Sequence, residues 1–246
     1  MSLVLKTSNL SKKYKDVFAV DSVCININRG EIYGLVGQNG AGKTTVMKMI
    51  AGLIRPSGGQ LELFGSTALN CQRAKIGYII ETPSLYSTMT ARQNLDVMLS
   101  LLPGNPRFSI NSVLDIVGLQ GTGSKKVSQF SHGMKQRLGI AMSLIGSPEF
   151  LILDEPINGL DPIGMNEFRG IIHRLNREYG LTILISSHIL SELFKLVTCY
   201  GVIAGGKLVA ELSDTDIKAF SLDDKSLENY IVKLMGGYDD VKVVEL

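Results

Sequence analysis

The chain has 246 residues, of which 45% are hydrophobic and 20% are charged, and its formal net charge at pH 7 is +2. This composition is typical of a folded globular protein and excludes a disordered chain. A charge so close to zero also excludes a general electrostatic attraction to nucleic acid or to anionic lipid.

The first part of the sequence predicts strands, then a loop and a helix. Val23–Ile27 and Ile32–Val36 are short stretches typical of β-strands. A glycine-rich loop at Gly37–Gly42 follows the second of them. Lys43–Ile54 then has apolar residues at helical spacing and ends before Pro56. The predicted order is therefore strand, loop and helix.

After about residue 90 the sequence changes to a helical period. Leu95, Met98 and Leu102 repeat at intervals of three and four residues. A further helix is predicted over Ser131–Ile145, because its apolar residues line one face and Pro148 prevents its continuation. The segment from about 82 to 147 is therefore a predicted helical insert.

Strands return after this insert. Phe150–Leu153 and Leu181–Ile185 are unbroken apolar runs, which are typical of parallel strands covered by helices on both faces. Val202–Ala204 and Lys207–Val209 follow, and the sequence from Ser213 onward is more charged and less periodic. The core is thus predicted to be α/β, with a small appendage at the end of the chain.

Three features of the sequence bear on the cellular compartment of the protein. Cys24, Cys71 and Cys199 lie far apart and form no even set, which favours a reducing environment. Apolar stretches such as Val46–Ile54 are shorter than the roughly 18 residues of a membrane span, so none is expected. Met1–Leu10 lacks a basic end followed by an apolar run, so no secretory signal is expected.

The glycine-rich loop matches the phosphate-loop pattern G-x-x-x-x-G-K-[ST] between a predicted strand and a predicted helix. Its glycines let backbone N–H groups converge on phosphate, and the helix N-terminus favours an anion. Lys43 is predicted to neutralise the β- and γ-phosphates, and Thr44 to bind Mg²⁺. The alternative is a glycine-rich turn with a chance lysine. The predicted nucleotide-binding residues in this segment are Gly37, Asn39, Gly40, Ala41, Gly42, Lys43, Thr44 and Thr45.

Two acids, Asp154 and Glu155, end the apolar strand that starts at Phe150. The carboxyl ends of strands form the edge at which open α/β sheets bind ligands. Asp154 is predicted to hold the magnesium shell, and Glu155 to orient or deprotonate the attacking water. The alternative is a strand that simply ends in solvent.

Residues 130–138, Phe-Ser-His-Gly-Met-Lys-Gln-Arg-Leu, lie just upstream of this strand and resemble the signature segment of ABC ATPases. Matching elements cover nearly the whole chain. The resemblance implies an α/β P-loop NTPase (RecA-like) core with an N-terminal antiparallel β-subdomain and an inserted α-helical subdomain. The implied divisions are 1–81 for the β-subdomain and phosphate-loop part, 82–147 for the helical subdomain, 148–212 for the rest of the core, and 213–246 for an appendage.

In this family two ATP molecules are sandwiched between two such domains. The resemblance therefore implies a homodimer, in which Ser131 and Gly133 of one chain bind the nucleotide held by the phosphate loop of the other. Asp161 resembles the family residue that acts across this dimer. Taken alone, Ser131 and Asp161 are equally compatible with helix caps.

Two further residues resemble known ligand contacts of the family. Tyr14 is similar to the aromatic residue that stacks on adenine, with ordinary strand packing as the alternative. His188 ends an apolar strand and is similar to the histidine that contacts the γ-phosphate and helps to hold Glu155. A purely structural histidine is the alternative.

The sequence departs from the family pattern at two positions. His132 stands where the first signature glycine is usual, and we expect a solvated side chain with no role. Glu81 stands where the family has a glutamine that touches Mg²⁺, and it still offers an oxygen ligand to the metal. This glutamate resembles ABC ATPases of the lantibiotic-immunity and bacitracin-resistance type, with a solvated loop residue as the alternative.

The implied function is that of an ATP-binding and ATP-hydrolysing subunit, with Mg²⁺, that powers export of a peptide antibiotic, drug or lipid-like compound through a separate permease. It implies a peripheral place on the cytoplasmic face of the plasma membrane and no nucleic-acid partner. One alternative is a soluble ABC ATPase that acts on DNA or ribosomes. Ser131 lies 131 − 44 = 87 positions after Thr44, and the segment between them holds no sustained heptads, which argues against this alternative. The other alternative is a regulatory module that binds ATP without hydrolysing it.

Overall fold

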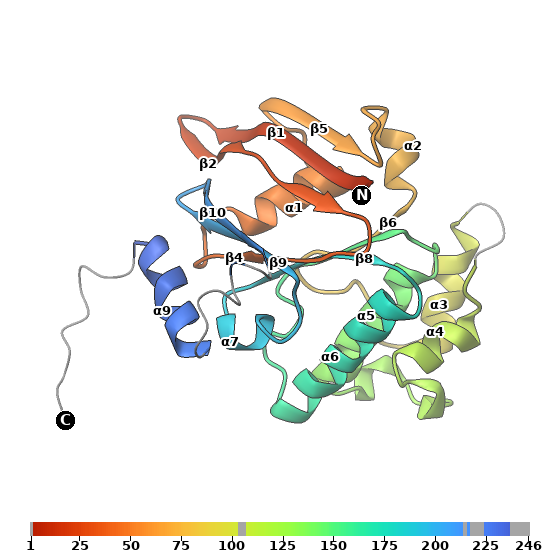
Figure 1. The fold of residues 1–246 in the computed structure, drawn as a ribbon. Coiled ribbons are helices and arrows are strands. Elements are labelled where there is room, and N and C mark those ends of the chain that lie inside the picture. The colour runs from red at the N-terminus through yellow and green to blue at the C-terminus, as the bar shows by residue number, and fades with distance from the viewer. Residues whose placement is uncertain (1, 103–106, 214–215, 217–223, 237–246) are drawn as a thin grey trace, which may run out of the picture.

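The computed structural model describes residues 2–102, 107–213, 216 and 224–236, and its strands form two sheets (Figure 1). The first sheet is antiparallel, with β1 at its centre. Its strands are β1 (Leu3–Tyr14), β2 (Val17–Val23), β3 (Asn26–Asn28) and β5 (Gly58–Leu63).

The second sheet forms the core and has the strand order β10-β9-β4-β8-β7-β6. Its strands are β4 (Ile32–Val36), β6 (Ile76–Ile79), β7 (Phe150–Leu153), β8 (Thr182–Ser187), β9 (Cys199–Ala204) and β10 (Lys207–Ser213). All neighbours are parallel except β10, which pairs with β9 in the antiparallel sense. Every residue of β4, β7 and β8 is buried, as expected of strands covered on both faces.

Helices cover the two faces of the core sheet, and Figure 1 shows α1 (Lys43–Ala51) between the two sheets. Val46, Met47, Met49 and Ile50 of this helix are fully buried. The opposite face is covered by three helices, α5 (His132–Leu144), α6 (Pro162–Arg177) and α7 (Leu190–Leu193). This layering fixes the start of α1 against the carboxyl end of β4.

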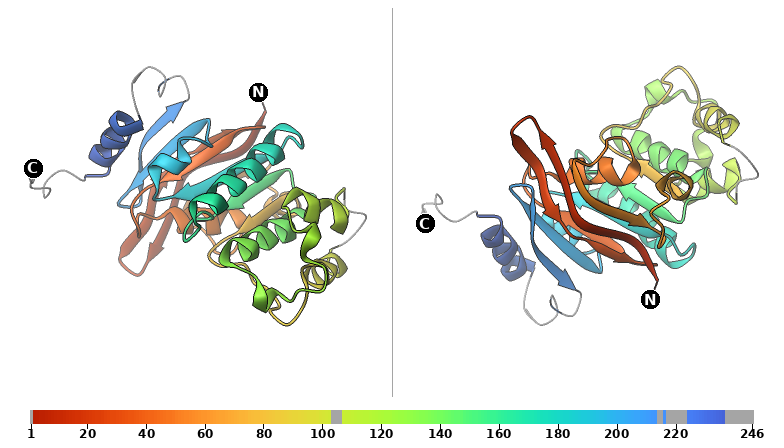
Figure 2. Two further views of the ribbon diagram at one scale, coloured as in Figure 1. Left: turned by 90° about the horizontal axis from the view of Figure 1, so that it is seen from below. Right: turned by 90° about the horizontal axis from the view of Figure 1, so that it is seen from above.

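The helical insert lies beside one end of the core sheet, and the last described helix lies at the other end (Figure 2). We call α3 (Ala91–Ser100), α4 (Ile110–Ile116) and α5 the helical lobe. The other helices in the described part of the chain are α2 (Leu69–Arg73), the 3₁₀ turns Gln120–Thr122 and Val127–Gln129, and α9 (Asp224–Leu234). Among the described residues, no helix combines the length and apolar character that crossing a bilayer requires.

The predicted fold class is confirmed, including the antiparallel sheet at the N-terminus and the inserted helices. One helix end differs from the prediction: α1 ends at Ala51 rather than near Ile54, because Gly52 adopts a left-handed conformation with φ 84°. The predicted appendage, 213–246, lies partly outside the described residues. Its helix α9 buries Ile231 completely.

Candidate active site

The phosphate loop joins β4 to α1 at the carboxyl edge of the core sheet. Two of its glycines have a steric reason to be there. A Cβ at Gly37 would lie 2.4 Å from the carbonyl oxygen of Ile203, and one at Gly42, whose φ is 110°, would lie 2.6 Å from that of Ala19. No side chain caps the N-terminus of α1, so its first N–H groups can meet an anion.

Lys43 lies along this loop with only 5% of its surface exposed. Its Nζ donates hydrogen bonds to the carbonyl oxygens of Gly37 (2.7 Å) and Gln38 (3.2 Å). The same Nζ is 3.1 Å from Oε1 of Glu155. The ammonium is therefore held over the loop by groups from two separate strand ends.

Of the other predicted loop residues, Asn39 and Gly40 are exposed and Ala41 is buried, while Gly42 and Thr45 are partly buried. The N–H of Ala41 donates to the Gln38 carbonyl at 3.1 Å. The exposed tip and the uncapped helix start form the part of the loop that a phosphate chain can approach.

Thr44 and Asp154 form the oxygen-rich part of the site. The Thr44 hydroxyl donates to Oδ2 of Asp154 at 2.7 Å, and the buried Ser186 hydroxyl donates to Oδ1 at 2.6 Å. Hydroxyl and carboxylate oxygens are the ligands that Mg²⁺ prefers. No group of three or more His, Cys, Asp or Glu residues that could hold a metal occurs in the described part of the chain. These two residues therefore suit a Mg²⁺ ion that takes most of its ligands from phosphate and water.

Glu155 lies directly after β7 and has a left-handed backbone, with φ 48°. Its N–H donates to the Ser186 hydroxyl at 2.8 Å, and its Oε2 accepts a hydrogen bond from Nδ1 of His188 at 2.7 Å. Because Oε1 meets Lys43, the carboxylate is shared between a lysine and a histidine. A left-handed glutamate is a strained backbone position, of the kind that clusters at functional sites.

The structure thus gathers five predicted residues into one connected group at the ends of β4, β7 and β8. They are Lys43, Thr44, Asp154, Glu155 and His188. Sequence reasoning missed Ser186, which contacts both acids. The sequence did contain a signal for this residue. Ser186 lies two positions before His188, near the end of the same apolar strand and at the edge where both acids were expected.

Replacing Ser186 with alanine should lower the free energy of unfolding by about 1–3 kcal/mol, because a buried acceptor of Asp154 and the N–H of Glu155 both lose their partner. Urea unfolding followed by circular dichroism measures this. The matched control is Ser100→Ala, whose exposed hydroxyl bonds only its own helix. Equal stability of the two variants would contradict the bridging role.

Three other predicted residues form a second group around the start of α5 and α6. Ser131 caps α5, with its hydroxyl accepting from the Met134 N–H at 3.2 Å. Asp161 caps α6, with Oδ1 accepting from the Gly164 N–H at 2.8 Å. Gly133 lies close to Leu160 in the loop between them. Among the hydrogen bonds of the described residues, none joins this group to the phosphate loop of the same chain.

His132 is exposed, yet it is not merely solvated as the sequence suggested. Its Nε2 donates to the carbonyl oxygen of Asn158 at 3.1 Å. A Cβ on Gly159 would lie 3.6 Å from the same ring. The histidine therefore links the start of α5 to the loop that follows Asp154 and Glu155.

Tyr14 and Glu81 stand apart from both groups. Tyr14 is 51% exposed at the end of β1, with the Lys12 ammonium 5.1 Å from its ring centre. Glu81 has φ 66°, and its Oε1 accepts from Nζ of Lys48 at 2.5 Å. The predicted metal ligand is thus bonded to a lysine of α1, which the sequence analysis did not single out. That lysine lies four residues after Thr44 and so shares its helix face.

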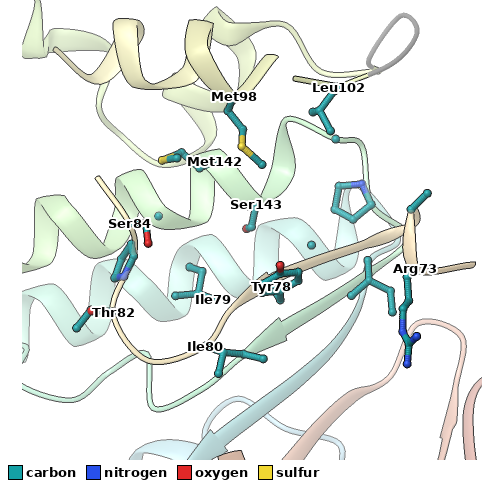
Figure 3. A pocket seen from close by; sticks show the side chains of 17 residues that line it. Arg73, Tyr78, Ile79, Ile80, Thr82, Ser84, Met98, Leu102, Met142 and Ser143 are labelled. Carbon is teal, nitrogen blue, oxygen red and sulfur yellow. The ribbon is translucent and has the colours of Figure 1, made fainter. Parts of the chain in front are cut away.

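A groove of about 420 Å³ lies between β6 and the helical lobe. Figure 3 shows Met98, Leu102 and Met142 on one side of it, and Tyr78, Ile79 and Ile80 on the other. Thr82, Pro83 and Ser84 also line it, so the loop that carries Glu81 forms part of its wall. The lining is mainly apolar, which suits contact with another protein.

Comparison with known proteins gives matches along the chain. The family described as "ABC transporter" matches residues 20–158. The bacitracin transport ATP-binding protein BcrA of Bacillus licheniformis is 45% identical over 256 aligned residues, covering 100% of this chain and 83% of that protein. The lantibiotic transport ATP-binding protein SrtF of Streptococcus pyogenes is 47% identical over 208 residues, covering 85% and 90%.

A solved structure has the same fold. CbiO1 from Clostridium perfringens, part of the ABC transporter complex cbiONQ, superposes with a TM-score of 0.81 and 25% sequence identity. The superposition covers 95% of this chain and 96% of that one.

Proposed function

Because this chain belongs to the ABC transporter family and is an ATP-binding subunit that hydrolyses ATP, we propose that it powers export of a peptide antibiotic through a separate membrane permease. The observation that carries the proposal is the connected group of Lys43, Asp154, Glu155 and His188 in a chain so similar to two peptide-antibiotic transport subunits.

ATP binds along the phosphate loop, with its adenine on the exposed Tyr14 ring and its phosphates at the uncapped start of α1. Lys43 donates to the β- and γ-phosphates. Thr44 and Asp154 would hold Mg²⁺, with Glu81 as a further ligand. The ion would supply charge neutralisation to the phosphate oxygens.

Glu155 orients the attacking water and accepts its proton, and His188 keeps the carboxylate in place through the hydrogen bond from Nδ1. Two chains enclose the nucleotides. Ser131 and Gly133 of one chain face the γ-phosphate bound by its partner, where the start of α5 offers N–H groups and the positive end of a helix dipole. Asp161 lies in the neighbouring loop and contacts the partner chain.

We infer that the permease binds at the groove between β6 and the helical lobe. The proposal puts this chain at the cytoplasmic face of the plasma membrane, as a peripheral subunit. The loop that carries Glu81 lines the groove and is bonded to α1, the helix that starts at the phosphate loop. ATP binding can therefore change the contact with a permease segment through this loop. The proposed divisions at 81 and 147 separate the nucleotide core from the lobe that shapes the groove, and the division at 212 separates the core from the appendage.

The proposal is tested by expressing the gene together with a candidate permease gene, sought beside it on the chromosome, in a sensitive bacterium. We expect resistance to bacitracin or to a lantibiotic to rise with the wild-type chain and to disappear with Glu155→Gln. Unchanged sensitivity to both peptides, with the complex present in the membrane, would contradict peptide-antibiotic export.

Met142→Glu should reduce recovery of the permease complex at least tenfold, because it buries a charge in an apolar contact. ATP hydrolysis by the isolated chain should stay within about twofold, since Met142 lies outside the connected group of site residues. Co-purification from detergent-solubilised membranes measures the first effect and phosphate release the second. Val209→Glu, on the exposed part of β10, is the control and should leave the complex intact.

A further inference from the structure

An ion pair that the proposed mechanism does not use joins α1 to the loop after β6. Nζ of Lys48 donates to Oε1 of Glu81 at 2.5 Å. The glutamate holds a left-handed backbone, which costs free energy for any residue but glycine. A bond to a neighbouring helix therefore supports a conformation that the loop sequence alone disfavours.

The surroundings of the lysine place it at the border of the metal site. Lys48 lies one helical turn beyond Thr44, whose hydroxyl bonds Asp154. Its pKa is raised mainly by the hydrogen bond to Glu81, against an opposing effect of burial, and the negative charges of Glu81 and Asp154 add to the rise. The ammonium is thus bonded to Glu81 and also lies in the electrostatic field of Asp154.

We propose that Lys48 tunes the electrostatics of the nucleotide site: its ammonium, which is bonded to Glu81 and lies one helical turn from Thr44, offsets the negative charge that Glu81 adds near the metal ligands. The inference rests on the proposed binding of Mg-ATP by these residues. It assigns to Lys48 the role of setting how strongly the site attracts Mg²⁺.

A purely stabilising surface pair does not account for the arrangement. Lys48 and Glu81 side chains are 30% and 65% exposed, and exposed ion pairs contribute little to stability. Ile80 and Thr82, on either side of Glu81, line the groove. The lysine therefore bonds a carboxylate whose two chain neighbours form part of the groove wall.

The test is a Mg²⁺ titration of fluorescent-ATP binding to the full chain that carries Glu155→Gln, so that no turnover intervenes. Lys48→Met should lower the Mg²⁺ concentration for half-saturation about threefold to tenfold, because one positive charge leaves the neighbourhood of the ion. Glu81→Gln should raise it by a similar factor. The double variant should return to within about twofold of the parent, and so should Lys48→Arg.

The control is Lys6→Met, which removes an exposed lysine whose Nζ is 4.0 Å from Glu62 on the antiparallel sheet. It should leave the titration unchanged. Two outcomes would overturn the proposal, provided that the Glu155→Gln parent binds Mg-ATP normally. In the first, Lys48→Met and Glu81→Gln shift the half-saturating Mg²⁺ concentration in the same direction. In the second, neither variant shifts that concentration by twofold. A parent chain that bound no ATP would instead overturn the proposed function, and the inference with it.

Discussion

Glu155→Gln is expected to reduce ATP hydrolysis at least a hundredfold, because an amide cannot accept the proton of the attacking water. ATP affinity should change only a few-fold. The amide oxygen still accepts from Nδ1 of His188, and Lys43 keeps its bonds to the carbonyl oxygens of Gly37 and Gln38. The phosphate-binding part of the site therefore survives the substitution.

Phosphate release measures the loss of hydrolysis, and light scattering after gel filtration measures the oligomeric state. With ATP and Mg²⁺ the variant should run as a dimer, since the closed sandwich persists when hydrolysis cannot open it. Glu178→Gln, on the exposed end of α6, is the matched control and should hydrolyse ATP as the wild type does. A variant of Glu155 that stays monomeric and hydrolyses ATP normally would refute the assignment.

Lys43→Met is expected to weaken ATP binding about tenfold to a hundredfold. Hydrogen bonds to charged groups contribute about 1.5–3 kcal/mol, and each 1.4 kcal/mol corresponds to a factor of ten in affinity. The lysine is buried over the loop, so its charge is screened by water far less than that of a surface lysine. Methionine keeps the apolar stem and removes only the ammonium.

Titration with a fluorescent ATP analogue measures this affinity, and thermal unfolding monitors whether the variant is folded. Lys6→Met serves as the control for loss of a single positive charge at a distance from the loop. A folded Lys43→Met protein with wild-type affinity would show that the ammonium does not contact phosphate.

The sequence could predict those parts of the site whose residues lie close together along the chain. The phosphate loop was predicted because glycines, Lys43 and Thr44 are contiguous between a strand and a helix, and the acids because they end an apolar run. The edge at which these segments meet follows from parallel strand topology. The end of α1 was missed because Gly52 terminates the helix earlier than the apolar spacing indicated.

The contacts that sequence could not predict join residues far apart in the chain. Lys43 and Glu155 are on different strand ends, and Lys48 meets Glu81 only because α1 packs beside the loop after β6. The bond from His132 to Asn158 likewise depends on how α5 lies against the loop before α6. The groove combines β6, α3 and α5, so its shape exists only after the lobe has packed on the sheet.

In the proposed mechanism, the phosphates of ATP and the carboxylate of Glu155 compete for the ammonium of Lys43. A triphosphate that draws the Lys43 ammonium toward itself releases Oε1 of Glu155, while the His188 bond keeps the other oxygen anchored. In the proposed mechanism, ATP binding would therefore free the Glu155 carboxylate to accept a proton from the attacking water.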